Sequence, residues 1–206
     1  MNKIIYIYVL DSFADWEIGY LLQALSNQGM INNEVTYEIR TVGLTRNPIK
    51  TIGGLTLIPD CTIDEIDEER LRALLLVGAN TWNEARNNVI LDKAIQYLDA
   101  GVLVGAICGA TLALAELGAL DNRNHTSNSL EYLLGYSKGY KGKEYYKNEL
   151  SVADKNLISA SSAGGLLWAR QIIEYLAIYT EQKTEAWYQY YATGDAKYFM
   201  EMIARD

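Results

Sequence analysis

The sequence predicts an α/β protein, a three-layer α/β/α sandwich with a mostly parallel sheet. Continuous apolar runs, such as residues 4–10 and 71–77, are typical of parallel strands that are buried on both faces. Segments with the apolar spacing of a helix follow these runs, as residues 16–25 follow the first one. Repeated strand–helix units of this kind form a parallel sheet with helices on both faces.

The elements of the first half follow from local patterns. Residues 4–10 predict the first strand, which Asp11 closes. Residues 12–15 fit a capping box, which predicts a helix directly after them. Residues 35–42 alternate between apolar and polar side chains and predict the second strand. Two short β-prone runs around Gly53 and Gly54 predict a hairpin over residues 51–58.

The second half continues the alternation of strands and helices. The predicted elements are a strand at 71–77, a helix at 91–98, a strand at 102–107, a helix at 112–120, a strand at 157–160, a helix at 164–179 and a Tyr-rich helix at 186–203. We expect residues 1–206 to form a single domain in which residues 181–206 are a C-terminal helical extension. A chain of 206 residues can bury a substantial core, and no linker or repeat interrupts it.

Composition argues against several classes of protein. The formal net charge of −8 is opposite to that of a general nucleic-acid binder. Lysines alternate with tyrosines between residues 136 and 147, but acidic neighbours favour a solvated loop that leads to an edge strand. No apolar run is long enough to span a membrane, and two cysteines make no disulfide framework. A single histidine excludes a His-rich metal site. We therefore expect a cytoplasmic protein with no metal, no cofactor, and no nucleic-acid or membrane partner.

The most informative stretch runs from residue 102 to residue 112. An apolar strand ends on Cys108, and small residues then open a helical segment. This order is typical of a nucleophile elbow, whose strained turn requires small neighbours; here they are Ala106 and Ala110. The helix N-terminus predicts a lowered pKa for the Cys108 thiol. The alternative is a buried structural cysteine, which is our interpretation of Cys61.

Two further features are expected at the same edge of the sheet. Ligands of parallel sheets bind beyond the carboxyl ends of the strands. Glu17 follows the first strand, Gly78 and Ala79 follow the strand at 71–77, and Cys108 follows the next strand. Their convergence favours a functional Cys108. Glu17 has an alternative explanation, because a helix dipole alone favours an acidic residue in the first turn. The four tryptophans are expected in the core or an interface rather than in a binding site.

Together these residues resemble the PfpI superfamily of class I glutamine amidotransferase-like proteins. It includes intracellular cysteine peptidases, the Parkinson-disease protein deglycase and glyoxalase-III-like enzymes. The resemblance extends from residue 1 to about residue 179 and implies a flavodoxin-like sandwich. It implies that Cys108 is the nucleophile, that Glu17 hydrogen-bonds its sulfur, and that the backbone amides of Ala79 and Gly109 form the oxyanion hole. It also implies that the protein forms a homodimer or a larger oligomer.

The sequence departs from the family pattern in two places. The usual Gly-Gly of the oxyanion turn is Gly78-Ala79 here, a mild change because the donor is a backbone amide. Members with a Cys/His pair carry histidine where this chain has Asn128. Strand alternation aims His125, the only histidine, at the opposite face. Asn128 is therefore either a turn residue or a substrate contact.

The resemblance implies hydrolase or lyase chemistry on a small carbonyl compound or a peptide, by thiolate attack. We expect weak activity on peptides, because Asn128 cannot take up a proton. Glu17 is expected to hold a proton at neutral pH, since burial and a nearby thiolate both favour the neutral carboxyl group. The alternative function is a non-catalytic thiol sensor of oxidative stress, or a binding protein, in which Cys108 is oxidised and nothing is turned over.

Overall fold

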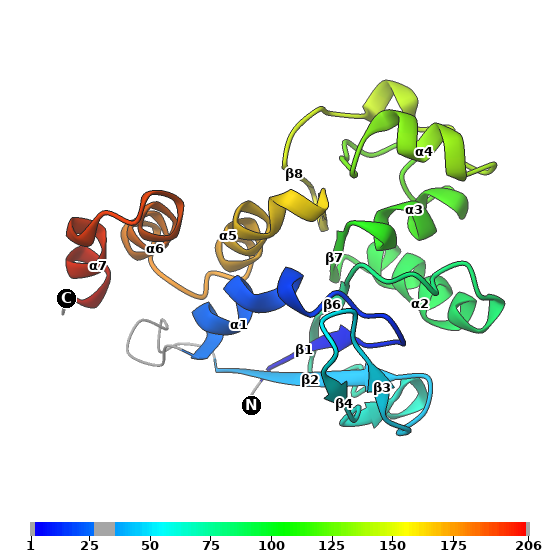
Figure 1. Ribbon diagram of the computed structural model, residues 1–206, viewed down its shortest axis with the longest axis horizontal. Helices are drawn as coiled ribbons and strands as arrows, with labels where there is room; N and C mark the ends of the chain where they lie inside the picture. Colours follow the sequence, from blue (N-terminus) through cyan, green and yellow to red (C-terminus); the bar gives the residue numbers. More distant parts are fainter. Residues whose placement is uncertain (1–2, 27–35, 205–206) are drawn as a thin grey trace.

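The structure, a computed structural model, describes residues 3–26 and 36–204. Within these residues, seven strands form one sheet in the order β5-β2-β1-β6-β7-β9-β8 (Figure 1). All neighbouring strands are parallel except β8 and β9. The strands are β1 (Lys3–Tyr8), β2 (Tyr37–Gly43), β5 (Cys61–Thr62), β6 (Leu71–Leu76), β7 (Leu103–Ile107), β8 (Ser151–Asp154) and β9 (Leu157–Ala160). The predicted mostly parallel sheet is confirmed.

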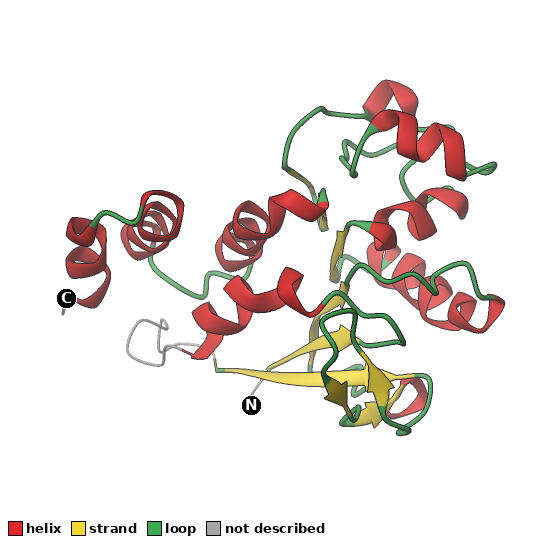
Figure 2. Cartoon of the chain, viewed as in Figure 1, coloured by secondary structure: helices red, strands yellow, loops and turns green. Residues whose placement is uncertain are grey.

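Helices cover both faces of this sheet and complete the three layers (Figure 2). α1 (Gly19–Ser26) and α5 (Gly165–Tyr175) pack together on one face, while α2 (Asn88–Asp99) and α3 (Gly109–Glu116) lie on the other. β7 is buried over its whole length, which explains why its sequence is continuously apolar rather than alternating. The α/β sandwich predicted from the sequence is therefore correct.

The predicted capping box before the first helix is wrong. Ser12 has a φ of 63°, and its hydroxyl accepts a hydrogen bond from the Asn80 N–H at 2.8 Å. Asp15 accepts one from the Thr51 hydroxyl at 2.6 Å. Residues Asp15–Ile18 form a 3₁₀ helix, η1, and α1 begins only after it. Both side chains tie neighbouring loops to the end of β1, so neither is available to cap a helix.

The second strand and the hairpin lie close to their predicted positions. β2 begins at Tyr37; Val35, where the predicted strand starts, lies outside the described residues. The hairpin pairs β3 (Ile49–Lys50) with β4 (Thr56–Leu57), so its first strand precedes the predicted range. The turn between them is closed at Thr51, whose hydroxyl accepts from the N–H of Leu55 at 2.9 Å.

Several predicted helices have different bounds in the structure; the helix predicted at 164–179, for example, is α5, which ends at Tyr175. The Tyr-rich helix is in fact two helices, α6 (Glu181–Thr193) and α7 (Ala196–Ile203), which we call the C-terminal helical pair. Gly194 lies between them with a φ of 71° and ends α6, as left-handed glycines commonly do. The helix after Cys108 begins at Gly109 instead of residue 112, because the elbow leads into it without an intervening turn.

The Lys- and Tyr-rich segment leads to an edge strand, β8, as predicted. It is not entirely solvated, because Tyr140 is buried and its hydroxyl lies 2.7 Å from Nε2 of His125. Helix α4 (Leu130–Tyr136) and strand β5 were not predicted. Both are short, and neither has a strong periodic pattern. In the described ranges, no helix is long and apolar enough to cross a membrane.

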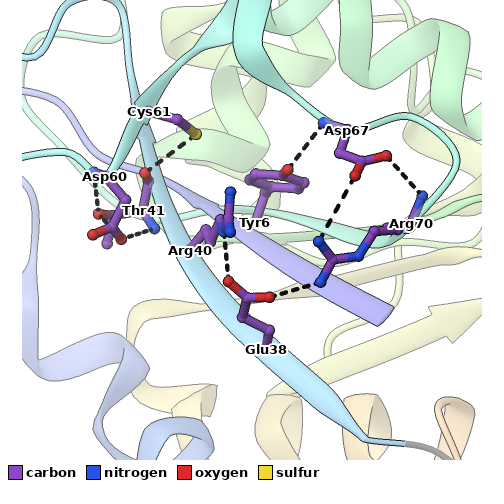
Figure 3. Close-up of polar contacts among 8 residues, drawn as sticks. All are labelled: Tyr6, Glu38, Arg40, Thr41, Asp60, Cys61, Asp67 and Arg70. Atoms are coloured by element: carbon purple, nitrogen blue, oxygen red, sulfur yellow. Dashed lines mark hydrogen bonds and ion pairs between the residues drawn. The ribbon is translucent and has the colours of Figure 1, made fainter. Parts of the chain in front are cut away.

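The region around β2 and β5 carries a cluster of polar contacts (Figure 3). Glu38 binds Arg40 at 2.6 Å and Arg70 at 2.7 Å, and all three side chains are partly exposed. The second cysteine, Cys61, is buried beside this cluster, with its sulfur 3.7 Å from the carbonyl oxygen of Thr41. These contacts link β2 to its neighbours and involve none of the predicted site residues.

Candidate active site

The candidate site residues follow three strands that are neighbours in the sheet. β1, β6 and β7 run parallel and lie side by side. Glu17 follows β1 in η1, Gly78 and Ala79 follow β6, and Cys108 follows β7. The carboxyl ends of the strands therefore bring these residues together, as the sequence-based argument predicts.

Cys108 forms a strained turn between β7 and α3. Its φ of 57° and ψ of −124° are rarely adopted by residues other than glycine. The surrounding backbone holds this conformation. The N–H of Cys108 donates to the carbonyl oxygen of Ala160 at 3.0 Å, and its own carbonyl oxygen accepts from the hydroxyl of Thr111 at 2.6 Å. Thr111 is held in turn by Ser127, 2.7 Å away. The side chain of Cys108 is thus kept at the tip of the elbow and is partly exposed.

Glu17 lies against Cys108 in a tightly enclosed position. The residue is only 2% exposed, and Oε2 accepts a hydrogen bond from the N–H of Gly78 at 2.8 Å. Among the described residues, Oε1 is buried without a hydrogen-bond partner. A Cβ on Gly78 would lie 2.8 and 2.9 Å from the two carboxyl oxygens and 3.0 Å from Cβ of Cys108. Only glycine fits between these two groups.

Burial changes the protonation of both groups. It raises the pKa of Glu17, although the Gly78 N–H and the Cys108 thiol act in the opposite direction. Burial also raises the pKa of Cys108, and the negative charge of Glu17 adds to this effect. The side chain of Asn128 and the N–H of Gly109 lower the pKa of the thiol, but less strongly. The expectation that the helix N-terminus lowers the Cys108 pKa below its ordinary value is therefore wrong for the resting site, because burial has the larger effect.

A proton on Glu17 alters this balance. The protonated carboxyl group carries no charge to repel a thiolate, and its O–H can donate a hydrogen bond to the sulfur. Because Oε2 already accepts from Gly78, Oε1 is the oxygen that is free to carry that proton. The pair can therefore hold one proton between carboxyl and thiol, which makes a thiolate accessible within a buried site.

The backbone around Cys108 offers N–H groups to a developing negative charge. A Cβ on Gly109 would lie 3.1 Å from the carbonyl oxygen of Ala79 and 3.5 Å from its nitrogen, so the two turns are in close contact. The N–H of Gly109 interacts with the Cys108 sulfur. Within residues 3–26 and 36–204, the N–H of Ala79 has no hydrogen-bond partner. Preorganised donors of this kind stabilise the oxyanion formed by attack on a carbonyl group.

Asn128 contacts the sulfur, whereas His125 does not. Nδ2 of Asn128 lies 3.4 Å from Sγ of Cys108, and its Oδ1 accepts from the N–H of Ser162 at 2.8 Å. The second bond fixes the orientation of the amide, so that its NH₂ group faces the sulfur. His125 is fully buried elsewhere, with its ring nitrogens 2.7 Å from the Arg123 carbonyl oxygen and the Tyr140 hydroxyl.

Sequence reasoning missed two residues that support the site. Ser162 orients Asn128 from the 3₁₀ turn Ser162–Gly164 directly before α5, and Thr111 holds the elbow from within α3. Neither has a local signature, because each role depends on a contact between distant segments. In the described part of the chain, no group of three or more His, Cys, Asp or Glu side chains is arranged to hold a metal ion.

Comparison with known proteins agrees with this arrangement. Residues 3–175 match the DJ-1/PfpI family. The chain belongs to the DJ-1/PfpI family. It is 35% identical over 200 residues to a protein of Bacillus subtilis named "Uncharacterized protease YoaZ", covering 97% of this chain and 95% of the relative. It is 27% identical over 171 residues to the deglycase TK1284 of Thermococcus kodakarensis, covering 81% and 95%. The crystal structure of a thiJ/pfpI family protein from Bacillus anthracis superimposes with a TM-score of 0.93 at 36% identity, covering 98% and 96%.

Family membership agrees with the resemblance recognised from the sequence. The relatives include proteins named as protease and as deglycase. The family is thus established at the level of fold and domain, whereas the particular reaction has to be argued from the site.

Proposed function

We propose that this protein is a cysteine-dependent hydrolase or lyase that acts on a small reactive carbonyl compound or a peptide. The observation that carries the proposal is the placement of Cys108 in a strained elbow, against the buried Glu17 carboxyl group and beside the backbone of Ala79 and Gly109. Nucleophile, proton-holding group and oxyanion donors are the components that thiol attack on a carbonyl requires.

In the proposed reaction, the Cys108 thiol gives its proton to Glu17, and the sulfur attacks the carbonyl carbon of the substrate. The C–S bond forms as the carbonyl π electrons move to oxygen, which the amides of Ala79 and Gly109 stabilise. Protonation of this oxygen gives a hemithioacetal from an aldehyde, with no leaving group. With a dicarbonyl compound, the Glu17 carboxylate can then take the C–H proton of the hemithioacetal and give it to the oxygen of the second carbonyl group, which forms an enediol. Return of a proton to the second carbon gives a thioester, and water hydrolyses it to a 2-hydroxy acid and the free thiol. With an ester or amide, the tetrahedral intermediate collapses, expels the leaving group and forms a thioester that water hydrolyses.

The residue beside the sulfur favours the first type of substrate. An amide must lose a poor leaving amine, which requires a proton from a positioned acid. Asn128 has no proton to exchange in the physiological range, so Glu17 would have to supply every proton. Positioned acid–base groups contribute about 10²–10⁴-fold to a rate. We therefore place reactive dicarbonyl compounds and activated esters before peptides, which fits the name of the deglycase relative better than that of the protease relative.

The proposal extends to the setting of the protein. We infer a cytoplasmic homodimer or larger oligomer that uses no cofactor and has no nucleic-acid or membrane partner. The net charge of −8 argues against a nucleic-acid partner, and among the described residues no helix is long and apolar enough to cross a membrane.

A substrate screen tests the reaction. Wild-type protein and Cys108→Ser are compared on methylglyoxal, p-nitrophenyl acetate and a mixture of peptides. We expect turnover of the first two classes by the wild type, no activity of the variant above background, and peptide cleavage at least about 10²-fold slower. Efficient peptide cleavage that depends on Cys108 would show that another residue supplies the base. Equal activity of both proteins would contradict the proposal.

A second candidate function is a thiol-based sensor of oxidative stress. The specific observation in its favour is that Asn128, a group without acid–base capacity, lies beside the sulfur. A sensor would oxidise at Cys108 to a sulfinate, which a protonated Glu17 would stabilise. Intact mass before and after peroxide measures this oxidation. Oxidation of Cys108 in a protein that turns over none of the substrates would favour the sensor.

A further inference from the structure

A hollow of about 340 Å³ lies next to the candidate active site, between η1, the start of α5 and the C-terminal helix α6. Glu17 and Ser162 are among its lining residues. Glu17 packs against Cys108, and Ser162 orients the amide that contacts the sulfur. Cys108 itself is not among the described lining residues; Glu17 lies between the hollow and Cys108, and Ser162 is linked to the sulfur through the two hydrogen bonds of Asn128.

The opposite wall of the hollow is aromatic. Trp16, Tyr20, Tyr188 and Tyr191 line it, with small and aliphatic residues between them. Trp16 is 55% exposed, whereas Trp82, Trp168 and Trp187 are buried. The expected core location therefore holds for the other three tryptophans, whereas Trp16 is a large exposed apolar side chain directly before the buried Glu17, for which an interface is the expected location.

Helix α6 is held firmly in the position that completes this wall. The indole N–H of Trp187 donates to Oε1 of Gln23 in α1 at 2.7 Å. Arg170 of α5 stacks on the Tyr188 ring at 4.6 Å and pairs with Glu185 at 2.8 Å. Figure 1 shows α6 lying beside α5, away from α3. Since these anchors use polar groups of α1 and α5, the tyrosines are fixed before any ligand arrives, which lowers the entropic cost of binding.

The chemistry of the walls restricts the occupant. Among the described residues that line the hollow, none is Lys or Arg, so no cationic side chain is there to pair with an anion. Glu17 is the single acidic side chain, and one of its oxygens is already bound to Gly78. A small dicarbonyl such as methylglyoxal would leave nearly all of the 340 Å³ empty. Pockets of about 300 Å³ and above, with apolar walls and few polar groups, are the usual size for small organic ligands.

We propose that this hollow binds an uncharged aromatic group of the substrate, attached to the carbonyl group that Cys108 attacks. The proposal rests on the proposed function and narrows it from small carbonyl compounds in general to aryl-substituted ones. It also gives a role to α6, which lies beyond residues 3–175 that match the family. The C-terminal helical pair is then part of the specificity apparatus.

Binding to an inactive variant tests the proposal without requiring turnover. Cys108→Ser is titrated with N-acetyl-phenylalanine methylamide and with N-acetyl-alanine methylamide, which differ by one phenyl group, while tryptophan fluorescence is recorded. Because Trp16 is the exposed tryptophan, we expect the phenyl compound to change the emission and the alanine compound to bind at least about tenfold more weakly. Adding Trp16→Phe should remove the signal.

Matched variants locate the phenyl group. Tyr191→Ala in the Cys108→Ser background should weaken binding of the phenyl compound about tenfold, because it removes one aromatic wall. Tyr198→Ala is the control, since it makes the same truncation in α7, outside the hollow. In the active protein, Tyr191→Ala should lower kcat/KM for p-nitrophenyl phenylacetate more than that for p-nitrophenyl acetate, whereas Tyr198→Ala should change either value less than twofold.

Several results would overturn the proposal. The first is equal affinity for the two amides, and the second is equal loss of binding in Tyr191→Ala and Tyr198→Ala. The third is tighter binding of phenethyl-trimethylammonium than of its uncharged carbon analogue, which would make the hollow a cation site. Acrylamide quenching of Trp16 fluorescence is also compared at concentrations where sedimentation shows an oligomer and a monomer. If acrylamide quenches Trp16 in the monomer alone, a second copy of the chain covers the hollow, and the proposal is wrong. Equal kcat/KM for p-nitrophenyl phenylacetate and p-nitrophenyl acetate would contradict the role of the hollow but leave the proposed function intact. Binding that is specific for the phenyl compound, without turnover of any substrate, would contradict the proposed function but leave the role of the hollow intact.

Discussion

The two cysteines of this chain occupy opposite kinds of environment. Cys61 lies in the edge strand β5, 3% exposed, and its sulfur faces the carbonyl oxygen of Thr41 (Figure 3). Cys108 lies at the tip of a strained turn, partly exposed, with an amide N–H₂ group facing its sulfur. Burial raises the pKa of both thiols. The difference lies in what else surrounds each sulfur.

Around Cys61, the strongest effect after burial is the negative charge of Glu65, which raises the pKa of the thiol further. Around Cys108, Asn128 and Gly109 donate to the sulfur, and the adjacent carboxyl group can hold the proton that the thiol loses. The reactivity of each thiol therefore depends on the neighbouring groups that stabilise the thiolate and accept the proton of the thiol. The direction of the pKa shift does not distinguish the two residues, because burial raises the pKa of both.

The largest effect should come from removing one sulfur or the other. Cys108→Ser should lower turnover of a dicarbonyl substrate at least about 10³-fold, because the nucleophile is lost. Cys61→Ala should change turnover less than twofold and lower the stability by about 1 kcal/mol, because it only leaves a small cavity. Initial rates and urea unfolding of both variants measure these effects. A Cys61 variant that folds normally but loses activity would break the comparison.

The next effect concerns the proton that Glu17 holds. Glu17→Leu should lower kcat by about 10²-fold, the typical contribution of a positioned acid or base. Glu17→Gln keeps a donor to the sulfur and should retain more thiol reactivity than Leu, although it cannot accept a proton. The rate of Cys108 alkylation separates the two roles, since it requires the thiolate and no later proton transfer. Unchanged alkylation in Glu17→Leu would show that the two side chains do not cooperate.

A smaller effect is expected in chemical labelling of the wild-type protein. Iodoacetamide near pH 7 should modify Cys108 at least about tenfold faster than Cys61, because Cys108 is more exposed and its thiolate has hydrogen-bond donors. Peptide mapping after short reaction times gives the two rates. Equal rates would mean that exposure and donors at the elbow do not compensate for burial.

These residues also show how far sequence reasoning reaches. The continuous apolar runs of β1, β6 and β7 identify a parallel sheet, and the sheet then places Glu17, Ala79 and Cys108 at one edge. This inference needs only the rule that parallel strands end together. The elbow is similarly local, since small residues on both sides of Cys108 are visible in the sequence.

What could not be predicted depends on contacts between distant segments. Ser12 and Asp15 fit a capping box by type and spacing, but their side chains bind Asn80 and Thr51 instead. The orientation of Asn128 depends on Ser162, 34 residues later. The pKa of Cys108 depends on burial, which no helix-dipole argument contains.

The smallest effect, and the sharpest test of the buried carboxyl group, is on stability. The folded-state pKa of Glu17 is raised by burial above the unfolded value of about 4.3. Below that value the carboxyl group is protonated in both the folded and the unfolded protein, so it does not lower the free energy of unfolding. As pH rises through the folded-state pKa, the folded protein must bury a charged carboxylate, and the free energy of unfolding decreases. Glu17→Gln cannot ionise, so it should stabilise the protein by about 1–2 kcal/mol at pH 8, in the usual range for replacing an active-site group, and by clearly less at pH 5. Urea unfolding at both pH values measures the difference, and Cys61→Ala serves as the control whose effect should be the same at both. If Glu17→Gln changed the free energy of unfolding equally at pH 5 and pH 8, Glu17 would carry the same charge in the folded and the unfolded protein. The contrast between the proton-holding site of Cys108 and the inert site of Cys61 would then lose its physical basis.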